Sequence, residues 1–309
     1  MGVKTGYRSN IGKSIELSIS TNGYHWIGLP NMNIQDLKEL LKSIRKYIKK
    51  KQTMRIYSNP YELMSETARN LWEMGNEVKP RTYQNKVIEG NDDFITKELI
   101  CEQYCLTHME DPAALFVFTK SKDWAEAEFE ERVCGSRENP GKAWELRKNV
   151  WEEFLVGGFF DYTYAERMNE TVSYKGKAFS KLEAVIELLR NDNDTRKAIL
   201  NIYGEVGFDN DCDSNYLGGE KRIPCSMYYD FLIRENARGE KQLNICYHQR
   251  SSDFVTHFGN DVYLAWRLME YVASEVGIKP GYLYHTIDSL HSYKKDWVKL
   301  KTSIQIELR

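Results

Sequence analysis

Apolar and polar residues alternate near the start of the chain, over residues 13–28. An Asn22-Gly23 pair interrupts this alternation, and such a pair is typical of a type I′ hairpin turn. Residues 33–51 then repeat leucine and isoleucine at helical spacing and end in lysines, which the helix dipole favours there. The pattern predicts a small ββα unit over residues 1–55, an appendage whose role the sequence does not indicate.

Residues 56–309 alternate between helical and strand-like patterns without repeats or low-complexity linkers, which predicts one mixed α/β domain. Residues 180–204 read as helix, polar turn and strand. Two strand-like runs between residues 226 and 250 predict a hairpin. That hairpin would bring Cys225 and Arg250 to the same end of neighbouring strands.

An apolar stripe with helical spacing runs from Val262 to Val272 and predicts a core helix. Asp261 directly precedes this stripe, so on propensity alone we expect it to cap the helix N-terminus. The alternative is that this carboxyl group contacts a ligand.

The composition excludes several classes of protein. Of the 309 residues, 41% are hydrophobic and 13% aromatic, which is enough to bury a substantial core. The net charge of −2 gives no general reason to expect a nucleic-acid or membrane partner. Residues 1–14 lack the apolar core of a signal peptide, and no long apolar run follows, so we expect a cytoplasmic protein. The six cysteines form no CxxC pair and no zinc-ligand spacing with the six histidines, so neither a disulfide nor a metal is expected.

A cysteine nucleophile needs a nearby positive charge that lowers its thiol pKa, and the predicted hairpin supplies Arg250 beside Cys225. One cysteine and one arginine occur together by chance in many chains, so the order of the surrounding motifs is more informative. The segments RIPCSMYYDF, QRSSDFVTHFGND and DSLHSY follow one another. This order resembles the thymidylate synthase family, which joins a Pro-Cys nucleophile, a Gln-Arg-Ser-x-Asp signature and a later His-x-Tyr pair. The resemblance covers about residues 58–297.

The resemblance implies a thymidylate synthase-like α/β (α+β) fold over residues 56–309, with a mixed sheet, flanking helices and a homodimer formed through the sheet face. It also implies a chemistry in which the Cys225 thiolate adds to carbon 6 of a pyrimidine nucleotide. Carbon 5 is then activated toward the one-carbon unit of 5,10-methylenetetrahydrofolate.

Site residues carry over from the family by position. Glu128 matches a glutamate that relays protons to the ring, with Glu131 as a rival on the same helix. The positions that match phosphate-binding residues are Arg81, Arg250 and Ser251, with Arg196 and Lys197 from the other subunit. The remaining matches are His291 and Tyr293 for the sugar hydroxyl, Asp253 for the folate pterin, and Tyr164 as a site tyrosine.

Position 261 departs from the thymidylate synthases, which carry there an asparagine whose amide matches uracil. Asp261 lies eight residues beyond Asp253 and thirty before His291. Cytosine presents an N3 acceptor and an N4 donor, and a carboxyl group that donates one proton and accepts another matches this pattern. The substitution resembles that of the cytidylate hydroxymethylases, which add water instead of hydride. A one-residue shift would instead place Asn260 against the base and restore a uracil substrate.

Only eighteen residues follow His291, whereas the synthases continue to a tail that closes over the folate, and loss of such a lid is compatible with water capture. We therefore expect a C5 hydroxymethyltransferase that acts on dCMP or CMP, of a kind that makes modified nucleotides for phage DNA or nucleoside antibiotics. The alternatives are a dUMP-using synthase or hydroxymethylase, and a non-catalytic nucleotide-binding or RNA-binding relative. The choice between deoxyribose and ribose stays open, because His291 and Tyr293 address a hydroxyl that both sugars carry.

Overall fold

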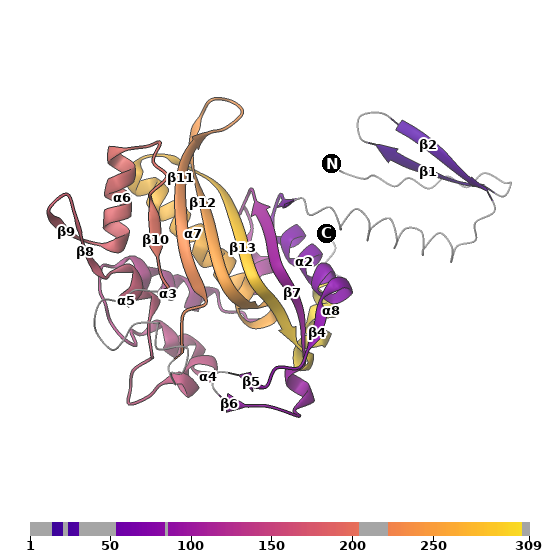
Figure 1. The fold of residues 1–309 in the computed structure, drawn as a ribbon, viewed down its shortest axis with the longest axis horizontal. Coiled ribbons are helices and arrows are strands. Elements are labelled where there is room, and N and C mark those ends of the chain that lie inside the picture. The colour runs from indigo at the N-terminus through magenta and orange to yellow at the C-terminus, as the bar shows by residue number, and fades with distance from the viewer. Residues whose placement is uncertain (1–13, 21–23, 31–53, 84–85, 204–221, 305–309) are drawn as a thin grey trace. The chain divides into compact units, whose positions relative to one another are not determined.

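The computed structural model describes residues 14–20, 24–30, 54–83, 86–203 and 222–304 (Figure 1). The chain divides into two compact units, Met1–Met54 and Arg55–Arg309. In the first unit, β1 (Ser14–Ser20) and β2 (Tyr24–Pro30) pair antiparallel, which confirms the two predicted hairpin strands. The predicted turn at Asn22-Gly23 and the predicted helix over residues 33–51 lie outside the described residues.

The second unit contains both helices and strands. Its helices are α2 (Pro60–Met74), α3 (Lys122–Val133), α4 (Lys148–Trp151), α5 (Tyr164–Met168), α6 (Lys181–Asn191), α7 (Gly259–Val276) and α8 (Trp297–Ile304). Its strands are β3 (Arg55–Tyr57), β4 (Asn76–Val78), β5 (Thr82–Tyr83), β6 (Lys86–Val87), β7 (Thr96–Leu106), β8 (Thr171–Tyr174), β9 (Lys177–Ser180), β10 (Ile199–Asn201), β11 (Ser226–Glu235), β12 (Lys241–Asp253) and β13 (Lys279–Tyr293). Across the described ranges, no helix combines the length and apolar character needed to cross a membrane.

A mixed sheet of seven strands organises the second unit, in the order β10-β11-β12-β13-β7-β3, with β4 also paired to β7. The strands β12 and β13 run parallel, as do β3 and β7, and the other neighbours run antiparallel. The predicted hairpin is confirmed, because β11 pairs with β12 from Glu235 opposite Lys241 to Ser226 opposite Gln249. The fold is therefore the predicted mixed α/β sheet with flanking helices.

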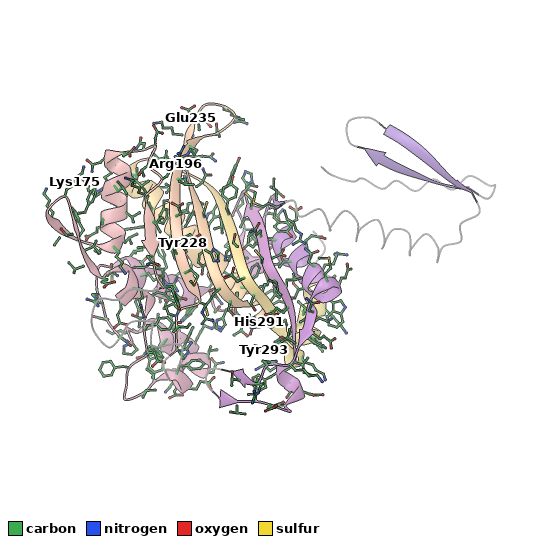
Figure 2. All side chains as sticks on the ribbon, viewed as in Figure 1. Lys175, Arg196, Tyr228, Glu235, His291 and Tyr293 are labelled. Carbon is green, nitrogen blue, oxygen red and sulfur yellow. The ribbon has the colours of Figure 1, made fainter. Side chains whose placement is uncertain are left out.

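One face of the sheet packs against α7, which lies behind β11, β12 and β13 in Figure 1. Leu243 and Ile245 of β12 are fully buried in the same core as Val262 and Met269 of α7. Burying each such side chain contributes about 1.5–3 kcal/mol, so this packing fixes α7 on the sheet. Side chains alternate across a strand, so the intervening residues face the opposite side. Tyr228, which lies on that side, is 37% exposed (Figure 2).

The core helix begins differently from the sequence-based prediction. A π-helical turn, η6 (Phe254–Phe258), leads directly into α7, so Asp261 lies within the first turn of α7 and is not its cap. Asp253 caps the whole helical segment instead, since its Oδ1 accepts a hydrogen bond from the backbone N–H of Val255 at 3.1 Å. The prediction that Asp261 caps the helix is therefore wrong, because the residues before it already have helical backbone geometry.

Candidate active site

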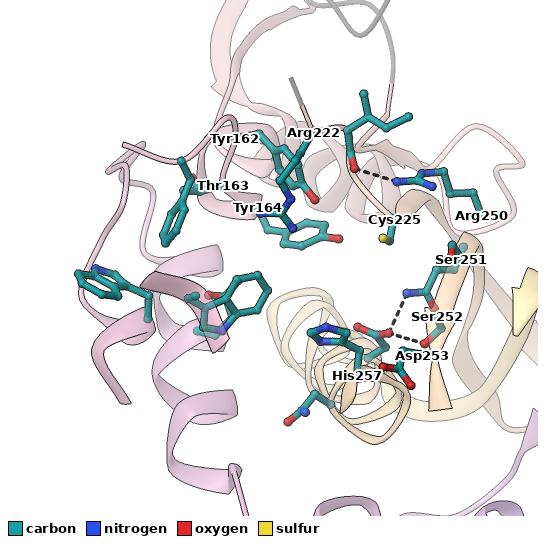
Figure 3. Close-up of a pocket in the computed structure, with 18 of the residues that line it drawn as sticks. Tyr162, Thr163, Tyr164, Arg222, Cys225, Arg250, Ser251, Ser252, Asp253 and His257 are labelled. Atoms are coloured by element: carbon teal, nitrogen blue, oxygen red, sulfur yellow. Dashed lines mark hydrogen bonds between the residues drawn. The ribbon is translucent and has the colours of Figure 1, made fainter. Parts of the chain in front are cut away.

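A cavity of about 430 Å³ collects most of the side chains singled out from the sequence (Figure 3). It lies where the end of β12 meets the start of α7, and cavities of this size commonly hold small molecules. The predicted residues in its lining are Glu128, its rival Glu131, Tyr164, Cys225, Arg250, Ser251, Asp253, Asn260, Asp261, His291 and Tyr293.

Cys225 enters the cavity just before β11, with Arg250 of β12 beside it. The backbone N–H of Arg250 donates to the carbonyl oxygen of Cys225 at 2.8 Å. Its guanidinium group donates to the carbonyl oxygens of Pro224 at 2.8 Å and Ile223 at 3.0 Å, which holds the positive charge near the thiol. Burial raises the pKa of the Cys225 thiol, and the charge of Arg250 acts against that rise. The thiol must therefore lose a proton before it can act as a nucleophile at neutral pH.

Asp261 points from α7 toward β12. Its Oδ2 accepts hydrogen bonds from Nε2 of Gln249 at 2.7 Å and from Oγ of Ser252 at 2.9 Å. Burial raises the pKa of this carboxyl group to about 6, although the two hydrogen bonds act to lower it. Near neutral pH the group can therefore gain or lose a proton, so it can both donate and accept hydrogen bonds.

Asn260 lines the same cavity, but its amide is engaged by the protein. Its Oδ1 accepts a hydrogen bond from Oγ of Ser121 at 2.7 Å, and its Nδ2 donates to the carbonyl oxygen of Thr256 at 3.5 Å. In the part of the chain that the structure describes, Oδ1 of Asp261 accepts no hydrogen bond from the protein. The carboxyl group at position 261 thus keeps one oxygen for a ligand, while both ends of the Asn260 amide are occupied.

Glu128 reaches the cavity from α3. Its Oε1 accepts a hydrogen bond at 2.9 Å from Nε of Arg132, one helical turn further along. Burial raises the pKa of Glu128, and Arg132 acts to lower it. The rival carboxyl group of Glu131 accepts backbone N–H bonds from Lys142 at 2.5 Å and Ala143 at 2.7 Å. Glu131 therefore anchors the segment that follows α3.

Aromatic and imidazole groups add hydrogen-bonding atoms to the lining. His291 and Tyr293 lie at the end of β13 with their rings edge to face, 5.2 Å between centroids. Tyr164, at the start of α5, accepts a hydrogen bond from Oγ of Ser226 at 3.3 Å. The guanidinium group of Arg132 lies 4.1 Å from the centroid of the Tyr164 ring.

The predicted phosphate-binding residues that lie outside the cavity lining are Arg81, Arg196 and Lys197. The Arg81 side chain is 82% exposed, and its Nε lies 3.7 Å from a carboxyl oxygen of Glu89. Arg196 and Lys197 are exposed ahead of β10, and Figure 2 shows Arg196 far from His291. Within one chain, the structure brings Arg250 and Ser251 to the cavity but not these three side chains.

Other polar residues of the lining were not predicted as site residues from the sequence, and they include Arg132, Tyr162, Arg222, Gln249, Ser252 and His257. Arg222 lies close enough to Cys225 to act with Arg250 in lowering the thiol pKa. A signal for His257 was present, because it precedes Asn260 and Asp261 by three and four residues and so shares their helix face.

Aromatic side chains form a further wall of the cavity, namely Trp124, Trp144, Trp151 and Phe160. The rings of Trp124 and Trp151 are stacked, with centroids 5.8 Å apart and 22° between their planes. Such a wall suits the flat pterin ring of a folate, and the carboxyl group of Asp253 is in the same lining. The residues present therefore fit methylenetetrahydrofolate.

Relatives of known sequence match about half of the chain. The "Putative thymidylate synthase" of Methanococcoides burtonii is 31% identical over 146 residues, which cover 47% of this chain and 59% of that protein. The deoxyuridylate hydroxymethyltransferase of Bacillus phage SP01 is 27% identical over 180 residues, which cover 56% of this chain and 44% of that protein. The chain thus spans less than two thirds of the length of these relatives.

A solved structure shares the fold. The thermostable thymidylate synthase A from Bacillus subtilis matches with a TM-score of 0.59 and 15% sequence identity, over 79% of this chain and 84% of that one. The family profile described as thymidylate synthase matches residues 134–309, more than half of the chain, and this range includes Cys225, β12 and α7. The chain therefore belongs to the thymidylate synthase family.

Proposed function

We propose that this protein is a pyrimidine nucleotide C5 hydroxymethyltransferase that converts dCMP or CMP to its 5-hydroxymethyl derivative. Methylenetetrahydrofolate, the one-carbon donor of this family, supplies the added carbon when it is bound. The observation that carries the proposal is the carboxyl group of Asp261 in the cavity that also contains Cys225.

Asp261 is proposed to recognise the base. A protonated carboxyl group donates to N3 of cytosine and accepts from its N4 amino group, and a uracil ring presents the opposite pattern. The pKa of about 6 supports this role, because a proton is available on Asp261 near neutral pH. A proton donated to N3 also withdraws electrons from the ring, which favours attack by a thiolate on carbon 6.

Cys225 is proposed to form the covalent bond to carbon 6. The addition makes carbon 5 nucleophilic, and carbon 5 then takes up the one-carbon unit. Arg250 stabilises the thiolate, and it binds the nucleotide phosphate together with Ser251. Glu128 is proposed to relay protons to and from the ring, for which its raised pKa is suited.

The remaining side chains are proposed to bind the rest of the nucleotide and the folate. His291 and Tyr293 would hydrogen-bond the sugar hydroxyl from the end of β13. Asp253 would contact the pterin beside the aromatic wall. Arg81 is proposed to reach the phosphate from its loop.

The sheet face opposite α7 is proposed as a homodimer interface. On this face Tyr228 lies beside His248, with ring centroids 5.4 Å apart, and Nε2 of His248 lies 3.0 Å from a carboxyl oxygen of Asp288. Arg196 and Lys197 would then complete the phosphate site of the partner subunit.

The proposal is tested by incubating the protein with methylenetetrahydrofolate and dCMP, CMP or dUMP, each labelled with tritium at carbon 5. We expect tritium release from a cytosine nucleotide and a product heavier by a hydroxymethyl group. Release from dUMP alone would exclude the cytosine substrate, and a product heavier by a methyl group would exclude water capture.

A uracil nucleotide is the second candidate substrate, either for a synthase or for a hydroxymethylase. It is favoured by the presence of Asn260 in the cavity lining and by the similarity to the phage deoxyuridylate hydroxymethyltransferase. A protein that binds nucleotides or RNA without catalysis is the candidate of another class. Absence of tritium release from all three nucleotides would support that candidate.

A further inference from the structure

The proposed reaction leaves one step without an assigned residue, the removal of a proton from the water that attacks the one-carbon unit. We propose that His257 is the general base for this step. The inference rests on the proposed hydroxymethyl transfer and adds a catalytic residue to it.

His257 lies in the π-helical turn η6, and it faces the cavity with Asn260 and Asp261. Figure 3 shows His257 and Cys225 pointing into the same cavity from different elements. Single π-helical turns within helical segments occur frequently at functional sites. His257 therefore lies close to the proposed base-binding acid and faces the space in which the reaction would occur.

The imidazole of His257 is neutral at physiological pH. Burial lowers its pKa to about 4. The charged and titratable groups that face it come from several elements: Asp253 acts to raise this pKa, whereas Arg147, Arg222 and His291 act to lower it. A neutral imidazole has one ring nitrogen with a lone pair, so it can take a proton from water.

The hydrogen-bonding capacity of His257 is unused by the described part of the protein. No group within those ranges hydrogen-bonds its ring, which instead packs near Trp151 with 5.8 Å between ring centroids and a tilt of 46°. The carboxyl groups of Glu128, Asp253 and Asp261, by contrast, each accept hydrogen bonds from protein groups. His257 thus differs from these three carboxyl groups in having no hydrogen-bond partner in the described ranges, so its ring can bind a water molecule and take up a proton from it.

The proposed step conserves atoms and charge. The water oxygen forms a bond to the exocyclic methylene carbon on carbon 5, and one water proton moves to His257. The electron pair of the exocyclic double bond shifts into the ring, and the double bond between carbons 5 and 6 re-forms as the bond from carbon 6 to sulfur breaks. Cys225 leaves as a thiolate and takes up a proton when His257 returns to its neutral form.

Two substitutions distinguish a role of His257 as a general base from a role in packing against Trp151. His257→Gln keeps a hydrogen-bonding side chain, and His257→Phe keeps a ring against Trp151, but neither can accept a proton. In single-turnover reactions with dCMP labelled with tritium at carbon 5, tritium release reports the steps before water attack. The mass of the hydroxymethyl product reports water attack itself.

We expect both variants to release tritium within about twofold of the wild-type rate but to form hydroxymethyl product about a hundredfold more slowly, the usual effect of losing a general base. The covalent adduct between protein and nucleotide should accumulate in both. His108→Gln is the matched control, because His108 is exposed and bonds the hydroxyl of Thr107, and it should behave as wild type.

If either variant formed the hydroxymethyl product at the wild-type rate, His257 would not be the general base. A fall in tritium release as large as the fall in product would also overturn this role, since that would assign His257 to an earlier step or to folding. If the wild-type protein itself makes no hydroxymethyl product, the proposed function fails as well, so the two failures are distinguishable.

Discussion

Nε2 of Gln249 donates a 2.7 Å hydrogen bond to Oδ2 of Asp261, and this bond links the strand that carries Arg250 to the first turn of α7. The bond favours the ionised form of Asp261 and so opposes the effect of burial on its pKa. Within the described ranges, Oε1 of the same amide is buried without a partner, which costs about 1–3 kcal/mol. Costs of this kind are usual where a buried polar group serves a ligand.

Asp261→Asn should change the preferred base. Gln249 and Ser252 both donate hydrogen bonds to this side chain, so they should hold the amide oxygen of the introduced asparagine toward β12 and leave its NH2 group, which can only donate, facing the ligand. A donor in that position matches O4 of uracil and not the N4 amino group of cytosine, so we expect kcat/KM for dCMP to fall about a hundredfold and that for dUMP to rise. Asn260→Asp is the matched control at the neighbouring position, because a carboxyl oxygen there can still accept the hydrogen bond from Oγ of Ser121. It should leave the base preference unchanged. Steady-state kinetics with both nucleotides measure this, and an unchanged preference in the position 261 variant would contradict the proposed role.

The pH dependence of kcat/KM for dCMP should change when Gln249 is substituted. Because kcat/KM reports the free enzyme, its value for dCMP should fall above pH 6, where Asp261 loses its proton. Gln249→Leu removes a hydrogen bond that lowers the pKa of Asp261, so the fall should move to higher pH, by roughly one unit. Profiles from pH 5 to pH 9 for both proteins test this, and a fall at the same pH in both would count against it.

Asp261 should also make stability depend on pH. Its pKa in the folded protein, about 6, is raised above the ordinary value of 3.8, so its contribution is present below pH 4 and is lost as the pH rises through 6. Relative to Asp261→Asn, the wild-type protein should lose roughly 2 kcal/mol of unfolding free energy between pH 4 and pH 8. Urea denaturation of both proteins at the two pH values measures this difference. A constant difference would mean that Asp261 ionises equally in the folded and unfolded chains.

Cys225→Ser should abolish the covalent step. We expect tritium release to fall on the order of a thousandfold or more, because a serine hydroxyl in this environment is a much weaker nucleophile. The adduct between protein and nucleotide should also disappear from intact-protein mass spectra. Cys101→Ser changes an exposed cysteine and should retain both signals. Tritium release at the wild-type rate from Cys225→Ser would exclude Cys225 as the nucleophile.

Shared sites across a homodimer should allow two inactive variants to complement each other. A double variant, Arg196→Ala with Lys197→Ala, keeps Cys225, and Cys225→Ser keeps both basic residues. Random mixing makes about half of the dimers mixed, and each mixed dimer holds one intact site, so about one quarter of wild-type activity should return. A mixture of Cys225→Ser with Arg250→Ala should stay inactive, because both changes fall in the same cavity. If the mixture of Cys225→Ser with the Arg196→Ala, Lys197→Ala variant stayed inactive, Arg196 and Lys197 would not contribute to the partner subunit's site.

Much of the architecture follows from local patterns. The two strand-like runs between residues 226 and 250 were enough to predict the hairpin, and in the structure its register brings Arg250 next to Cys225. Register follows from alternation because a slip by one residue would expose the buried face of the strand. The order of three short motifs was enough to indicate the family that the profile match shows.

Which side chains face the cavity depends on the tertiary structure. Each residue of a helix turns by about 100°, so the helical turn that precedes α7 sets the direction of every side chain that follows. Propensity could not detect that η6 continues into α7, and it therefore assigned Asp261 to the cap. Asn260 and Asp261 have different hydrogen-bond partners: Ser121 of the segment before α3 engages Asn260, and Gln249 of β12 engages Asp261. Both partners belong to other elements of the fold, so helix periodicity alone does not predict them. Composition and spacing identified the chemical groups, but burial and long-range hydrogen bonds set their orientation and their protonation.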